Sequence, residues 1–71
     1  MSNANASAAT TYMLTFAAPV LSAAMVDAQD RDVTADDASR VCRELGAGAH
    51  LTNHRGYHVA DVGSNGALRW L

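Results

Sequence analysis

The sequence contains no lysine, so its five basic residues are all arginine, and seven acidic residues outnumber them. The formal net charge at pH 7 is −2. Proteins that bind nucleic acid directly usually carry a clustered positive surface, because their affinity comes from neutralising phosphates. The charge balance therefore argues against a basic nucleic-acid-binding domain, whereas it suits either an ordinary soluble surface or contact with a basic protein groove.

The chain has one cysteine, Cys42, which excludes an intrachain disulfide bond. Because no feature requires an oxidising compartment, we expect the protein in the cytoplasm. The apolar run from Tyr12 to Val26 has no basic residue before it and is too short and too rich in alanine to span a bilayer. We therefore expect neither a secretion signal nor a membrane contact.

The length of 71 residues allows one domain with a small core. Residues 1–10 have no large apolar side chain after Met1 and are expected to form a disordered tail. Residues 11–71 are expected to form the single small domain. A core of this size gives marginal stability, so oligomerisation or binding to a larger partner is expected.

The clearest element is a helix that begins after Thr34 and ends at Gly46. Thr34 suits the N-cap position, and Asp36 and Asp37 place negative charge at the positive end of the helix dipole. Gly46 can end the helix in the left-handed conformation. The helix has a single apolar stripe, which needs a sheet or another helix to cover it; its members are Ala38, Val41, Cys42 and Leu45.

Most of the remaining chain has the alternation and turn residues typical of strands. The predicted strands are 12–17, 22–29, 49–52, 57–62 and 67–71. The stretch 22–29 has an alternative, since its alanine, leucine and methionine content also favours a helix over 20–29. The strand is preferred because it gives the first strand a hairpin partner.

The fold class that follows is α+β, with a small antiparallel sheet in the order β-β-α-β-β-β and one helix packed on one face. The expected core draws on ten side chains from these elements: Leu14, Phe16, Val26, Val41, Leu45, Leu51, Val59, Val62, Leu68 and Trp70.

Catalytic and metal-binding patterns are weak. His50, His54 and His58 are spaced by four, but Gly56 favours a hairpin there, and no second group of ligands is evident, so no metal site is predicted. Asp36 and Asp37 are explained by their place at a helix start. With no nucleophile beside a base and no phosphate-binding loop, we expect no enzyme and no cofactor.

The best candidates for contact with a partner are exposed charged and aromatic side chains. Asp36, Asp37 and Glu44 offer negative charge on the helix. Arg55 and Tyr57 flank a hairpin tip, where loops on a rigid scaffold often carry binding. These five residues form the predicted partner-binding set.

The sequence resembles small phage and mobile-element proteins, including some type I anti-CRISPR proteins that lay a helix on an antiparallel sheet. The resemblance lies in the overall pattern of residues 12–71. It covers the helix start Val-Thr-Ala-Asp-Asp-Ala-Ser-Arg-Val at 33–41 and the ending Gly-Ala-Leu-Arg-Trp-Leu at 66–71. No functional residue is carried over by motif.

The resemblance implies a non-enzymatic protein-binding module, an inhibitor that occupies the nucleic-acid groove of a host CRISPR effector complex. The acidic residues would imitate phosphate charge; they are Asp27, Asp30, Asp32, Asp36, Asp37, Glu44 and Asp61. Two other functions remain open. One is a nucleic-acid-binding or antitoxin-like regulator that uses Arg55 and Arg69. The other is a small structural subunit that completes its core by oligomerising.

Overall fold

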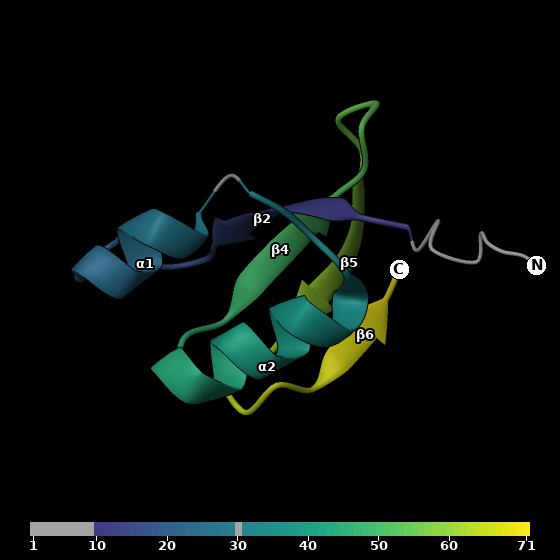
Figure 1. Cartoon of the computed structure of the whole chain (residues 1–71). Coiled ribbons are helices and arrows are strands. Elements are labelled where there is room, and N and C mark those ends of the chain that lie inside the picture. Colours follow the sequence, from purple (N-terminus) through teal and green to yellow (C-terminus); the bar gives the residue numbers. More distant parts are fainter. Residues whose placement is uncertain (1–9, 30) are drawn as a thin grey trace, which may run out of the picture.

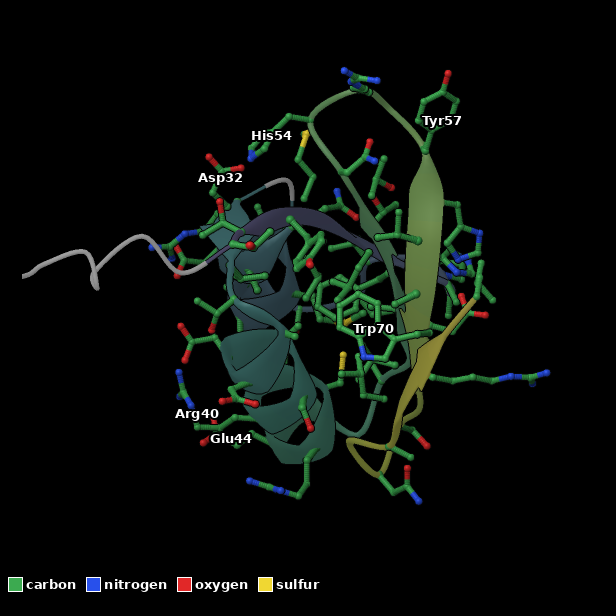
Figure 2. All side chains as sticks on the ribbon, turned by 90° about the vertical axis from the view of Figure 1, so that its right-hand side faces the viewer. Asp32, Arg40, Glu44, His54, Tyr57 and Trp70 are labelled. Atoms are coloured by element: carbon green, nitrogen blue, oxygen red, sulfur yellow. The ribbon has the colours of Figure 1, made fainter. Side chains whose placement is uncertain are left out.

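A computed structural model describes residues 10–29 and 31–71, and it confirms an α+β fold with a five-stranded antiparallel sheet (Figure 1). The strand order across the sheet is β3-β2-β4-β5-β6. The strands are β2 (Tyr12–Phe16), β3 (Asp32–Val33), β4 (Ala49–Thr52), β5 (His58–Val62) and β6 (Leu68–Trp70). Two helices, α1 (Ala23–Ala28) and α2 (Ala35–Leu45), lie on one side of the sheet (Figures 1 and 2). Of the predicted disordered tail, residues 1–9 lie outside the described part of the chain.

Helix α2 has the boundaries that its sequence indicates. The Thr34 hydroxyl accepts a hydrogen bond of 3.1 Å from the backbone N–H of Asp37, which satisfies one free donor of the first turn. At the other end Gly46 adopts φ 64°, a left-handed conformation that favours glycine. The apolar stripe faces the sheet, and Ala38 and Cys42 are fully buried.

The strand prediction for residues 22–29 was wrong, because α1 occupies Ala23–Ala28. The alanine and methionine content of this stretch favours a helix, as the alternative prediction held, and a cap residue stabilises the start of that helix. Ser22 accepts a hydrogen bond of 3.1 Å from the N–H of Met25. Met25 is the one buried residue of α1, whereas Val26, an expected core residue, is 65% exposed. The sheet partner that this stretch was expected to provide for β2 is instead β3, at the edge of the sheet.

The remaining strands lie close to their predicted positions. Strand β4 coincides with the prediction, and β2, β5 and β6 are each shorter by one or two residues. All pairings are antiparallel, with β2 and β5 on either side of β4. The hairpin turn before β6 also contacts α2, because the Ser39 hydroxyl donates to the backbone carbonyl of Gly66. A side chain at Gly66 would meet the Ser39 carbonyl at 2.9 Å, so this close approach requires glycine.

The core lies between the sheet and the two helices. Among the expected core residues, Leu14, Phe16, Leu51 and Val62 are buried. Four others are partly buried and pack against them: Val41, Leu45, Val59 and Leu68. Trp70 is not a core residue, since it is 51% exposed. Its indole lies on the α2 side of the sheet and packs edge-on against Tyr12, with ring centroids 5.5 Å apart (Figure 2).

Within residues 10–29 and 31–71, neither helix has the length and apolar content needed to cross a membrane.

Candidate functional site

A groove of about 330 Å³ lies between α1 and α2, beside the edge strand β3. We call it the α1–α2 groove. It is lined by Ala24, Asp27, Ala28, Arg31, Asp32, Val33, Asp37, Arg40, Val41, Glu44 and Leu45. The lining comes from three consecutive elements, α1, β3 and α2, and from the residues that connect them.

Most apolar side chains of this lining are partly buried, whereas its charged side chains are exposed. The apolar members are small or branched aliphatic residues, and four of them are partly buried against the core: Ala28, Val33, Val41 and Leu45. Around them stand four carboxylates and two guanidinium groups, so the groove carries an excess of negative charge at neutral pH. An apolar floor with a charged rim is the usual composition of a protein-binding surface.

Arg40 lies between two of the carboxylates. Its Nη2 is 3.0 Å from Asp37 Oδ1, and its Nη1 is 3.8 Å from Glu44 Oε2. The hydrogen bond to Asp37, with the charges of Asp37 and Glu44, raises the pKa of the Arg40 guanidinium above its ordinary value. These side chains are more than half exposed, so the pairs add little to stability and remain available to a partner.

A second pair lies on the α1 side of the groove. Arg31 Nη1 is 3.2 Å from Asp27 Oδ2, and the same guanidinium donates to the Asp27 backbone carbonyl at 3.4 Å. Asp32, on β3, completes the acidic set around the groove (Figure 2). Of the acidic residues that the sequence proposes as phosphate mimics, Asp30 lies outside the described residues.

The structure divides the predicted partner-binding residues between two places. Asp37 and Glu44 line the groove, whereas Asp36 is exposed on the same helix turn but does not line it. Arg55 and Tyr57 lie in the β4–β5 loop, and Figure 2 shows Tyr57 at the opposite end of the molecule from Glu44. The five residues therefore do not form one surface.

The β4–β5 loop is held by its own hydrogen bonds. The side-chain carbonyl of Asn53 accepts from the backbone N–H groups of Arg55 and Tyr57, at 2.9 and 3.0 Å. This arrangement fixes the loop and leaves Tyr57 64% exposed. The tip is thus an ordered and exposed position, as the sequence predicts.

Two features of the groove were not predicted from the sequence. Because residues 22–29 were expected to form a strand, Asp27 and Arg31 were not expected next to α2. Arg40 was given no role, although its spacing from Asp37 and Glu44 is the helical i,i+3 and i,i+4 spacing at which opposite charges meet. That spacing was a usable signal.

Comparison with protein-family models, curated proteins and solved structures finds no match to this chain. The function proposed below therefore depends on the geometry of the molecule.

Proposed function

We propose that this protein is a non-enzymatic protein-binding module, acting in the cytoplasm, that holds a basic segment of a partner in the α1–α2 groove. The observation that carries the proposal is the groove itself, with partly buried aliphatic side chains in its lining and four carboxylates around them. A lysine or arginine side chain suits such a surface, because its aliphatic stem packs on apolar groups while its charged end meets carboxylates.

The partner that best fits the resemblance is a nucleoprotein complex of host defence, such as a CRISPR effector complex. Proteins of that kind hold nucleic acid in positively charged channels. Carboxylates that are grouped around a groove can meet the arginine and lysine side chains of such a channel and exclude the nucleic acid. The net charge of −2 and the lack of lysine support this choice over direct nucleic-acid binding.

The proposal is tested with three immobilised baits in lysate of cells that contain the native host's defence complexes. The baits are the wild-type protein, Asp37→Lys and Asp36→Lys. The two substitutions make the same charge change in the same helix turn, so both disturb the helix dipole similarly. Of these two aspartates, only Asp37 lines the groove. Proteins retained on each bait are quantified by mass spectrometry after nuclease treatment.

A groove-binding partner is retained by the wild type and by Asp36→Lys and is depleted on Asp37→Lys. Equal depletion on both variants, with folding intact by circular dichroism, would show that the partner contacts a surface outside the groove. A wild-type bait that retains no specific partner would contradict the proposal.

A separate measurement addresses direct nucleic-acid binding. We expect no binding of the isolated protein to duplex or single-stranded DNA at physiological salt in a fluorescence anisotropy titration. Tight binding that is lost in Arg55→Ala or Arg69→Ala would favour the nucleic-acid-binding regulator instead.

A further inference from the structure

The open face of the sheet, opposite the helices, carries a group of side chains that the proposed function does not use. His50 on β4 and Asp61 on β5 are directly opposite partners in the antiparallel register. Directly opposite residues on one face have their Cβ atoms about 5 Å apart, which brings their side chains into contact. His50 Nδ1 is 2.8 Å from Asp61 Oδ1.

An irregularity in the β4–β5 ladder adds a third residue. Leu51 pairs with Ala60, but the next residue, Thr52, pairs with His58, so the register shifts between them. In a regular strand, residues three apart point to opposite faces, and His58 would point away from Asp61. A β-bulge can redirect a side chain. Here His58 Nε2 lies 2.6 Å from Asp61 Oδ1.

The two imidazoles also contact each other, with ring centroids 4.8 Å apart and an angle of 70° between the rings. One potential ligand atom from each of His50, His58 and Asp61 lies within 4.8 Å of the other two. The two histidines hold the pKa of Asp61 below its ordinary value, chiefly through the hydrogen bond from His50 and then that from His58.

From this geometry we propose that His50 Nδ1, His58 Nε2 and Asp61 Oδ1 form a binding site for a divalent transition-metal ion, zinc in the first place. Two imidazole nitrogens and one carboxylate oxygen are a common ligand set for zinc. The sequence prediction of no metal site assumed that no further ligand accompanied the histidines. Asp61 supplies that ligand, and only the strand register and the bulge show it.

Zinc binding requires a modest rearrangement of the three side chains. Ligand atoms about 2.0–2.1 Å from a tetrahedral zinc ion are about 3.3 Å apart, so the two contacts to Asp61 Oδ1, at 2.8 and 2.6 Å, must open by about 0.5 and about 0.7 Å. The two imidazole nitrogens, which lie within 4.8 Å of each other, must approach each other by no more than about 1.5 Å. The three side chains are 40–45% exposed, which leaves them free to rotate by this amount. Each neutral imidazole must hold its proton on the ring nitrogen that faces away from the ion, which frees the other nitrogen as a ligand.

Three protein ligands leave one tetrahedral position for water or for a side chain of another molecule. Because the cluster lies on the exposed face of the sheet, that position faces solvent. The site therefore differs from a closed structural zinc site, and its loss should leave the fold intact.

The chain provides a matched control in its third histidine. His54 lies in the β4–β5 loop and points toward the side of the sheet that carries the helices (Figure 2). Its Nε2 is 3.4 Å from the Thr11 hydroxyl, and it does not belong to the cluster. If zinc bound to surface histidines in general, His54→Ala would weaken binding as much as loss of His50 or His58.

Zinc chloride is titrated into the wild-type protein and into His50→Ala, His58→Ala, Asp61→Asn and His54→Ala, with binding followed by calorimetry and by amide chemical shifts. We expect one zinc ion per wild-type chain, a rise in melting temperature on binding, and shifts centred on residues 50, 58 and 61. Loss of any of the three ligands should weaken binding at least about tenfold, and His54→Ala should bind as the wild type does.

The proposal is overturned if the wild type shows no saturable binding near one equivalent. It is equally overturned if His54→Ala loses as much affinity as the three cluster variants, because zinc would then bind to surface histidines in general. The chemical-shift map of the wild type decides the location without any variant, so a misfolded variant does not leave the question open.

Discussion

Two neighbouring rows of residues cross the sheet, and they face opposite sides. The row on the helix side contains Leu14, Leu51, Ala60 and Trp70, and the row on the open side contains Thr15, His50, Asp61 and Arg69. On each strand the two rows are one residue apart. The first three residues of the helix-side row are fully buried, whereas His50 and Asp61 have side chains that are 45% and 40% exposed. The difference shows that, in a chain of this size, the buried apolar side chains that stabilise the fold can lie on one face of the sheet, while polar side chains able to bind a ligand lie on the other.

Truncation of two adjacent residues of β4 should show the largest difference between the two faces of the sheet. Leu51→Ala removes a completely buried side chain and should lower the free energy of unfolding by about 2–5 kcal/mol. His50→Ala, on the open face, should lower it by no more than about 1 kcal/mol, because it removes one part-exposed hydrogen bond to Asp61. Urea denaturation followed by circular dichroism measures both. If Leu51→Ala is already unfolded in water, the asymmetry is confirmed; similar small losses for the two variants would contradict it.

The two faces also differ in how well the sequence predicts them. The apolar alternation of β2 and β4, with the cap and stripe of α2, determines which residues face the helices, and those predictions were correct. The pairing of His50 with Asp61 depends on the register of β4 and β5. The position of His58 depends on a bulge that no residue type in the sequence predicts. Sequence periodicity gives the face of a residue but not its neighbour on the next strand.

The sequence did not predict the α1–α2 groove for a different reason. The stretch 22–29 is short and apolar, and such runs fit a strand or a helix equally well. Ser22 was a usable cap signal, but Met25 and Val26 differ in burial only because of how α1 packs on the core. Trp70 shows the same limit, since an aromatic residue at a core-facing position of an edge strand stays exposed where no helix covers it.

A smaller effect distinguishes the two helices that cover the sheet. Thr34→Ala removes the cap of α2 and should cost about 1 kcal/mol of global stability. Ser22→Ala removes the corresponding cap of α1 and should cost less, because α1 has six residues and one buried side chain and can open while the sheet remains folded. Urea denaturation of both variants and amide hydrogen exchange in α1 test this. A larger global loss for Ser22→Ala would show that α1 is part of the cooperative core.

The smallest effect concerns the thiol beneath α2. Burial raises the pKa of Cys42 above its ordinary value of 9.0, because the charged thiolate is disfavoured there. The stability that this gives is complete below the unfolded pKa and is lost as pH rises through the higher folded pKa. We expect Cys42→Ala to show a weaker decline in melting temperature above pH 9 than the wild type. Identical alkaline profiles, or rapid labelling of the native thiol, would contradict the burial of this group.

The most direct test of the proposed function is the affinity of the purified partner for Asp37→Lys and Asp36→Lys, measured by calorimetry against the wild type. Both variants carry the same charge change in the same turn of α2, and only residue 37 lines the groove. If the groove holds a basic segment, Asp37→Lys weakens binding about tenfold or more, which corresponds to at least about 1.4 kcal/mol, and Asp36→Lys has a much smaller effect. Equal losses for the two variants would show that overall charge, and not the groove, determines binding.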